Sequence, residues 1–179
     1  MPTHELVYTQ FANRSQDIHR GRGMQIEKNV WVTVRYRLYD SQGEAIEEGE
    51  REVTYLQGGY GSVFEKIETA LLGKTLGYST SLYLEPDDTF GDYDAELLKM
   101  AARDVFPDAL EPGMTFESVP GEPADGELYT VTDITDEVVI LDGNHPLAGM
   151  SLRFDLEVDD LRAASDEEVA AEIERQKPD

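Results

Sequence analysis

Side chains alternate between two faces without a break over residues 30–39. The even-numbered positions carry the apolar and aromatic face, Val30, Val32, Val34, Tyr36 and Leu38. A two-residue period of this kind is typical of a β-strand with one buried face. Shorter runs, separated by turn-forming residues, predict further strands at 53–56, 79–84, 114–119, 128–134, 138–141 and 151–161.

Three other segments have the residues of helices. Ser62 and Glu65 match the capping box that begins a helix, and Gly73 would end that helix. Its apolar face would consist of Val63, Phe64, Ile67, Ala70 and Leu71. A short amphipathic helix is expected over 95–102, and a C-terminal helix over 166–176 begins at a second capping box, Ser165 with Glu168. Many short strands around one central helix indicate an antiparallel α+β fold.

Two regions stand apart from this pattern. Residues 1–23 have no periodicity and are expected to form a loose extension. Residues 96–141 carry strands of their own, between an aromatic turn at 89–94 and a turn rich in Gly, Asn and Pro at 143–149. One set of strands that interrupts another predicts an inserted subdomain.

Composition narrows the class of protein. Apolar residues make up 40% of the chain, which excludes a disordered protein. No apolar run approaches the roughly 20 residues that a membrane-spanning helix needs, and the N-terminus lacks the apolar segment of a secretory signal. The absence of cysteine excludes disulfides, thiolate metal sites and cysteine nucleophiles. We therefore expect a cytoplasmic protein.

The charge is extreme, with 38 acidic against 15 basic residues and a net charge of -23. Such a field repels phosphate groups, so nucleic acids and anionic membranes are excluded as partners. Two explanations of the acidity remain open. It can serve solubility alone, as in a salty cytoplasm, or it can keep complexes with half-folded client proteins soluble.

Few residues suggest metal or nucleotide chemistry. The glycine-rich loop before the central helix lacks the lysine and the strand–helix–strand context of a phosphate-binding loop. The acids between 87 and 94 lack the spacing of a calcium loop, and Asp92 or Asp94 is expected to cap the next helix. His145 has no partners for a metal ion, so neither a metal nor a cofactor is predicted. Asn144 and His145 instead lie in a rigid turn beside an apolar strand, which suits holding a backbone amide.

The segment 143–158, GNHPLAGMSLRFDLEV, also carries a resemblance. An Asn-His-x-Leu-Ala-Gly turn before a Leu-x-Phe-x-Leu-x-Val strand is similar to the SlyD branch of the FKBP-type prolyl isomerases. Further markers of this branch stand in the family's order along residues 24–161: Tyr36, Tyr55-Leu56-x-Gly58, Glu68-Thr69-Ala70-Leu71, Phe90-Gly91-x-Tyr93-Asp94 and Asp104-Val105-Phe106.

The resemblance implies a fold and a domain plan. An FKBP-like domain, in which an antiparallel half-barrel sheet wraps a short helix, would comprise residues 24–95 and 142–164. Residues 96–141 would form a small β-rich insert-in-flap domain that binds unfolded chains, and residues 165–179 a C-terminal helix. The protein would act as a monomer, without a cofactor, on unfolded or partly folded proteins and proline-containing peptides. The nickel-binding tail of related proteins is not expected, because the sequence ends in SDEEVAAEIERQKPD.

The resemblance also implies a pocket. Its catalytic positions fall at Tyr36, Glu47, Phe90, Tyr93, His145 and Phe154. Its substrate-binding positions fall at Ile46, Val53, Val63, Phe64, Ile67, Asn144, Leu147 and Ala148. Tyr36 would donate a hydrogen bond to the ligand. Plain core packing is the alternative for Val53, Val63, Ile67 and Phe154.

These residue types suit rotation about an amide bond. The barrier to that rotation is about 18–20 kcal/mol because resonance makes the bond partly double. The twisted transition state has lost this resonance and has less charge separation, so a dry pocket lined by rings favours it over the planar amide. We therefore predict a peptidyl-prolyl cis-trans isomerase with chaperone activity.

Two alternatives remain. Glu47 stands where the family usually has Asp, and Phe90 where it often has Tyr. One alternative is therefore a binding module or holdase of the same fold with little catalysis. A carboxylate-based hydrolase would need two pocket carboxylates with displaced pKa values, and only Glu47 is placed near the pocket.

Overall fold

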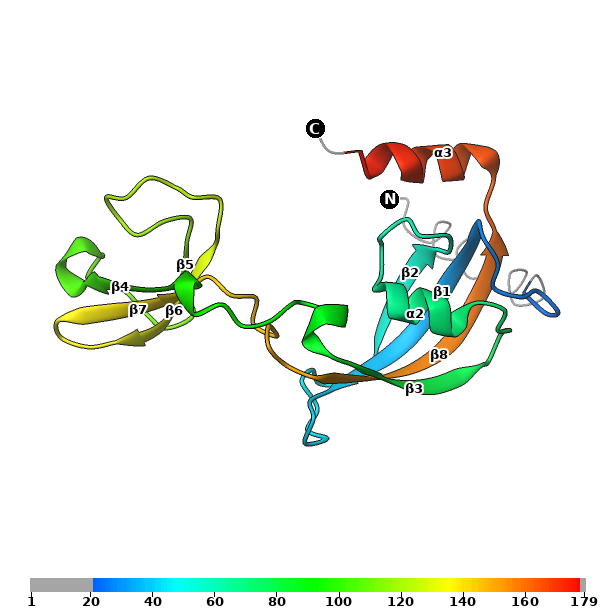
Figure 1. Ribbon diagram of the computed structural model, residues 1–179, viewed down its shortest axis with the longest axis horizontal. Helices are drawn as coiled ribbons and strands as arrows, with labels where there is room; N and C mark the ends of the chain where they lie inside the picture. Colours follow the sequence, from blue (N-terminus) through cyan, green and yellow to red (C-terminus); the bar gives the residue numbers. More distant parts are fainter. Residues whose placement is uncertain (1–20, 178–179) are drawn as a thin grey trace, which may run out of the picture. The chain divides into compact units, whose positions relative to one another are not determined.

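The computed structural model describes residues 21–177, whose contacts form two compact units (Figure 1). The first unit combines the chain up to Thr89 with the chain from Ser151 onward, and the second is Phe90–Met150. The extension predicted at 1–23 lies outside the described residues except for its last three. Of these, Gly21 is already buried, beside Leu161.

A four-stranded antiparallel sheet in the order β2-β1-β8-β3 forms the first unit. Its strands are β1 Val30–Tyr39, β2 Arg51–Leu56, β3 Ser79–Leu84 and β8 Leu152–Ala163. The sheet curls around the helix α2, Glu65–Leu71 (Figure 1). The even-numbered residues of β1 are buried as predicted, apart from Tyr36, which stays partly accessible. The predicted class, an α+β fold with an antiparallel half-barrel sheet around a short helix, is confirmed.

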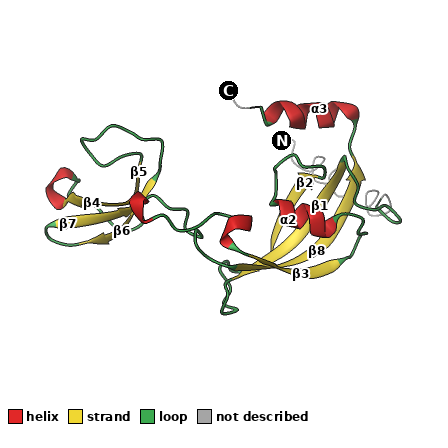
Figure 2. Cartoon of the chain, viewed as in Figure 1, coloured by secondary structure: helices red, strands yellow, loops and turns green. Residues whose placement is uncertain are grey.

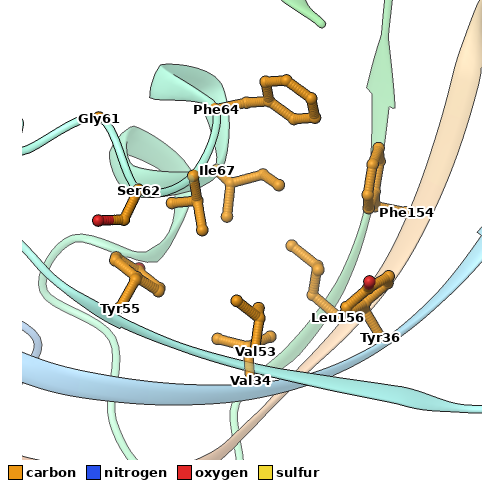
Figure 3. Close-up of a pocket in the computed structure, with 11 residues that line it drawn as sticks. Val34, Tyr36, Val53, Tyr55, Gly61, Ser62, Phe64, Ile67, Phe154 and Leu156 are labelled. Atoms are coloured by element: carbon orange, nitrogen blue, oxygen red, sulfur yellow. The ribbon is translucent and has the colours of Figure 1, made fainter. Parts of the chain in front are cut away.

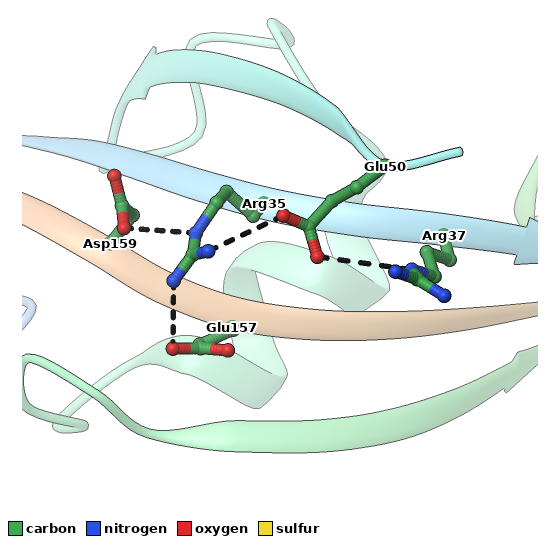
Figure 4. Close-up of polar contacts among 5 residues, drawn as sticks. All are labelled: Arg35, Arg37, Glu50, Glu157 and Asp159. Carbon is green, nitrogen blue, oxygen red and sulfur yellow. Dashed lines mark hydrogen bonds and ion pairs between the residues drawn. The ribbon is translucent and has the colours of Figure 1, made fainter.

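The outer face of this sheet carries charge. β8 has a bulge at Asp159, which has no partner in β1 because the register of the pairing shifts there. Arg35 of β1 lies among three carboxylates (Figure 4), with contacts of 3.3 Å to Glu50, 2.9 Å to Glu157 and 2.9 Å to Asp159. One guanidinium thus offsets the mutual repulsion of three acids on a strongly acidic protein.

The second unit has a separate antiparallel sheet, in the order β4-β7-β6-β5 (Figure 2). Its strands are β4 Leu98–Ala102, β5 Thr115–Phe116, β6 Tyr129–Ile134 and β7 Val138–Asp142. The unit has a core of its own, made of Phe106, Leu110, Val119, Tyr129, Val131, Val139 and Leu141. It contains the whole predicted insert, 96–141, together with residues 90–95 and 142–150 on either side of it.

The helix predicted over 95–102 is wrong. Asp94 caps a single 3₁₀ turn, Ala95–Leu97, by accepting a hydrogen bond of 2.8 Å from the Glu96 amide, and β4 follows at once. Leu, Lys, Met and Ala are good helix formers, but pairing with β7 outweighs this weak local preference. The strand predicted at 114–119 is also shorter than expected, since only β5 is paired.

The first capping box is wrong and the second is confirmed. Phe64, not Ser62, precedes the first turn of α2, and no side chain caps that turn. Ser165 and Glu168 form both hydrogen bonds of the box that begins α3, Asp166–Arg175. Within residues 21–177, no helix has the length and apolarity needed to cross a membrane.

Candidate functional site

An apolar cavity of about 250 Å³ lies between the sheet and α2 in the first unit. Its lining, shown in Figure 3, consists of Val34, Tyr36, Val53, Tyr55, Gly61, Ser62, Val63, Phe64, Ile67, Phe154 and Leu156. None of these residues is charged. Since a water molecule occupies about 30 Å³ in the liquid, the cavity accepts a group of side-chain size.

Strand periodicity explains how the cavity is built. Residues two apart on a strand point to the same face, so β1, β2 and β8 each contribute a pair of lining residues. The register then brings the pairs together, with Val34 opposite Val53 and Tyr36 opposite Leu156. The loop before α2 and the first turn of that helix close the remaining side.

Aromatic rings shape one end of the cavity. The ring centre of Phe154 lies 6.0 Å from that of Tyr36 and 6.1 Å from that of Phe64, with the latter pair edge to face. Phe154 itself is 7% exposed. Rings at these distances attract each other, which stiffens this end of the pocket.

Three of the residues that line the cavity carry a hydroxyl group, and two of these hydroxyls have a partner within the first unit. Tyr55 donates a hydrogen bond of 2.9 Å to the buried side chain of Gln57, and Ser62 donates one of 2.9 Å to Glu172. Across the described part of the chain, the Tyr36 hydroxyl has no hydrogen-bond partner. Burial, and then the charge of Glu47, raise the pKa of Tyr36, so this phenol stays protonated and able to donate at neutral pH.

The structure brings some of the predicted site residues together. Those that line the cavity are Tyr36, Val53, Val63, Phe64, Ile67 and Phe154. Ile46 and Glu47 belong to the same unit but not to the lining. The Glu47 carboxylate lies 3.3 Å from the Arg51 guanidinium, and no pair of carboxylates lines the cavity as a hydrolase would need.

The other predicted site residues belong to the second unit: Phe90, Tyr93, Asn144, His145, Leu147 and Ala148. The rings of Phe90 and His145 are stacked, with centres 3.8 Å apart and planes at 4°. His145 accepts a hydrogen bond of 3.1 Å at Nδ1 from the Leu147 amide, so it fixes the turn. A role of these residues toward substrate stays a prediction.

Asn144 does hold a backbone amide, but one of its own chain. Its Oδ1 accepts from the Asp94 amide and its Nδ2 donates to the Asp94 carbonyl, both at 2.8 Å. Tyr93 donates to Asp142 at 3.0 Å, and this bond raises the pKa of its phenol. Asn144 therefore ties together the two segments that lead into and out of the second sheet.

Sequence reasoning missed part of the lining. Val34 and Leu156 share their faces with Tyr36 and Phe154, so the same periodicity that predicted the strands would have found them. The local sequence predicts Ser62 as a helix cap, and no local signal indicates its place in the cavity wall. Among residues 21–177, no group of three His, Asp or Glu side chains is arranged to hold a metal ion.

Several bacterial proteins are similar to this chain along most of its length. The FKBP-type peptidyl-prolyl cis-trans isomerase SlyD of Treponema pallidum (strain Nichols) is 35% identical over 157 residues, which cover 86% of this chain and 88% of that protein. Proteins of the same name from Escherichia coli (strain K12) and Haemophilus influenzae are each 34% identical and cover 82% of this chain. The matches span 76% and 78% of those two proteins. No family model matches the sequence.

Proposed function

Because this chain belongs to the SlyD family of FKBP-type peptidyl-prolyl cis-trans isomerases, we propose that the cavity between its sheet and α2 is the prolyl-binding active site. The observation that carries this assignment is an uncharged cavity of side-chain size in which one hydroxyl, that of Tyr36, has no partner among the described residues. Such a cavity suits a proline ring with an amide at its edge.

The reaction follows from desolvation and positioning. For an X–Pro bond the two isomers differ by only about 0.5–1 kcal/mol, so the enzyme changes the rate and not the equilibrium. The apolar walls exclude water from the amide, which favours the twisted, less charge-separated transition state. The Tyr36 hydroxyl donates to a carbonyl of the bound chain and holds it while the bond rotates. No nucleophile and no cofactor take part in this mechanism.

A matched pair of variants tests the active site. Phe154→Ala opens the aromatic end of the cavity, whereas Leu161→Ala removes a buried side chain of the same strand that does not line it. Both destabilise the fold, by about 2–5 kcal/mol. Below the melting temperature of both variants, Phe154→Ala should lower kcat/KM for a short proline peptide roughly tenfold or more, and Leu161→Ala should not. Equal activity of the two variants would contradict the assignment.

We further propose that the second unit holds unfolded or partly folded chains. Within a unit that already has its own core, large apolar side chains remain exposed: Leu98 at 43%, Met100 at 70%, Val105 at 46%, Met114 at 39% and Leu128 at 58%. Leu98 and Met100 share one face of β4, and Met100 is paired with Ile140 of β7; neighbouring exposed apolar side chains are typical of surfaces that bind other chains. Met100 lies on β4, an edge strand, whose outer backbone groups can pair with an extended client.

The two activities support each other. A small cavity around one proline binds a long client weakly, and a second binding surface on the same chain raises the local concentration of its prolines. The net charge of -23 keeps such complexes soluble and disfavours nucleic acids and membranes as partners. We expect the enzyme to act as a cytoplasmic monomer on proline-containing segments of folding proteins.

A polar replacement in the second unit tests the chaperone role. Met100→Gln with Leu128→Gln should abolish suppression of aggregation and slow the proline-limited refolding of a protein, while leaving a short peptide substrate unaffected. Tyr83→Gln is the control, because Tyr83 is 70% exposed in the first unit. If the double variant suppresses aggregation as well as the unchanged protein does, the second unit has no chaperone role.

A further inference from the structure

One wall of the cavity is the glycine-containing loop before α2, residues 58–63, whose backbone has few conformational restraints within the loop itself. Gly59 and Gly61 have φ angles of 80° and 73°, a region that glycine enters readily and other residues rarely. Ser62 and Val63 follow directly and line the cavity. Contacts from outside the loop therefore have to fix the position of this wall.

Three hydrogen bonds tie the loop to the rest of the first unit. The Gly59 amide donates to Glu68 at 3.0 Å, the Tyr60 hydroxyl donates to Asn29 at 2.6 Å, and the Ser62 hydroxyl donates to Glu172 at 2.9 Å. Of these three donors, only Ser62 lines the cavity. Figure 3 shows its hydroxyl pointing away from the other lining side chains, so its partner stands behind the wall.

That partner is a buried carboxylate of the C-terminal helix α3. Glu172 is 4% exposed and also accepts hydrogen bonds from Arg175 and Gln176. Burial opposes its ionisation, but the bonds from Ser62 and Gln176 and the charge of Arg175 hold the pKa of Glu172 below its usual range. The acceptor is therefore charged, and a hydrogen bond to a charged acceptor is stronger than one between neutral groups.

The apolar face of α3 is largely exposed to solvent. Ile173 is 46% exposed although it adjoins the buried Glu172. The start of α3 is fixed to β8 by two hydrogen bonds from Arg162 to Glu168, of 3.0 and 2.7 Å. Polar contacts thus orient this helix and direct the Glu172 carboxylate at the cavity wall.

We propose that Glu172 is a positioning residue for prolyl isomerisation: it fixes Ser62, and through it the cavity wall, so that α3 sets how tightly the cavity holds its substrate. This inference rests on the proposed function of the cavity. The wall contacts the bound chain in both the ground and the transition state, and an interaction of that kind changes KM more than kcat.

Variants at the two ends of the bond test the proposal, with KM and kcat measured on a tetrapeptide that contains one X–Pro bond. Ser62→Ala and Glu172→Ala should each raise KM by about three- to tenfold, the range expected for one hydrogen bond, and change kcat less than about twofold. Glu172→Gln keeps a carbonyl oxygen that accepts from Ser62 but loses the charge, so KM should rise by less than in Glu172→Ala. Glu174→Ala, an exposed position of the same helix, is the control and should change neither constant.

The double variant Ser62→Ala with Glu172→Ala should be no worse than Glu172→Ala alone, since both changes remove the same bond. Melting curves measured for each variant separate a change in KM from a loss of stability. Ser62→Ala leaves the bonds of Glu172 to Arg175 and Gln176 in place. Unchanged KM in Ser62→Ala overturns the proposal. So does an equal loss in Glu172→Gln and Glu172→Ala, because Glu172 would then act only through its charge.

Phe154→Ala, measured in parallel, separates this inference from the proposed function. If Phe154→Ala loses activity while Ser62→Ala and Glu172→Ala do not, the cavity is the active site and the role of Glu172 is refuted. If all three keep full activity, the cavity is not the active site and both proposals fail.

Discussion

Two tyrosines line the same cavity, and replacing each by phenylalanine should have a different effect. We expect Tyr55→Phe to lower stability and Tyr36→Phe to lower activity. Tyr55 is fully buried and its hydroxyl donates to Gln57, a side chain that is 4% exposed. Tyr36 is partly accessible, and among the described residues its hydroxyl has no partner. Replacing each tyrosine by phenylalanine removes one oxygen atom and leaves the ring in place.

The expected magnitudes follow from these partners. Tyr55→Phe leaves the buried Gln57 oxygen without a donor, which costs about 1–3 kcal/mol of unfolding free energy. For a unit of this size that lowers the melting temperature by roughly 5–15 °C. Tyr36→Phe breaks no internal bond, so the melting temperature should stay within about 2 °C, while the lost bond to substrate lowers kcat/KM roughly two- to tenfold.

The assay combines thermal unfolding with isomerisation of a short proline peptide, measured well below both melting temperatures. Exchange between cis and trans signals in NMR spectra reports the rate without a coupled enzyme. The reasoning is refuted if Tyr36→Phe keeps full kcat/KM, or if Tyr55→Phe reduces kcat/KM as much as Tyr36→Phe while stability is unchanged. Either result would mean that the unengaged phenol is not the group that holds the substrate.

Two further predictions concern charge. Arg35→Ala leaves three carboxylates facing one another and should lower the melting temperature by several degrees at low salt. The loss should be smaller in 1 M NaCl, where charges are screened over about 3 Å. Arg37→Ala is the control and should lower the melting temperature less, because Arg37 lies 3.8 Å from Glu50 and contacts no other carboxylate of this group. Arg162, with the Ser165 amide, lowers the pKa of Glu168 to about 2. As pH falls through the ordinary range of a Glu carboxyl, about 4.3, toward 2, the unfolded chain takes up the proton first, so this stabilisation is lost. Arg162→Ala should therefore lose less stability than the unchanged protein over that pH range in urea titrations.

The sequence predicted those parts of the fold in which local pattern and tertiary contacts agree. The alternation over β1 reflects a real buried face, because the sheet packs that face on α2. The segment Leu98–Ala102 shows the opposite case. Its residues favour a helix locally, but its backbone pairs with β7, and the gain from completing a sheet exceeds the small differences in helix propensity.

The candidate site likewise has a part that the sequence predicts and a part that it does not. The aliphatic and aromatic walls were predictable, since they are inward positions of amphipathic strands and of the segment predicted as a helix, although Val63 and Phe64 of that segment precede α2. The role of Ser62 was not predictable from local sequence. Serine three residues before a glutamate is the pattern of a capping box, yet its hydroxyl bonds to Glu172, 110 positions further along the chain. Rules based on neighbouring residues cannot identify a partner so far away in the sequence.

The hydroxyl groups of Tyr36, Tyr55 and Ser62 illustrate the kind of positioning on which we propose that this enzyme depends. Catalysis of amide rotation depends on how well walls and donors are placed before the substrate arrives. The Tyr55 hydroxyl bonds to the buried Gln57 and the Ser62 hydroxyl to Glu172 of α3, whereas we propose that the Tyr36 hydroxyl donates to the substrate. The first bond holds a buried side chain of the cavity, and we infer that the second fixes the wall that follows Gly59 and Gly61. If Glu172 acts as proposed, residues of α3 that touch no substrate change affinity while the chemistry in the cavity stays the same.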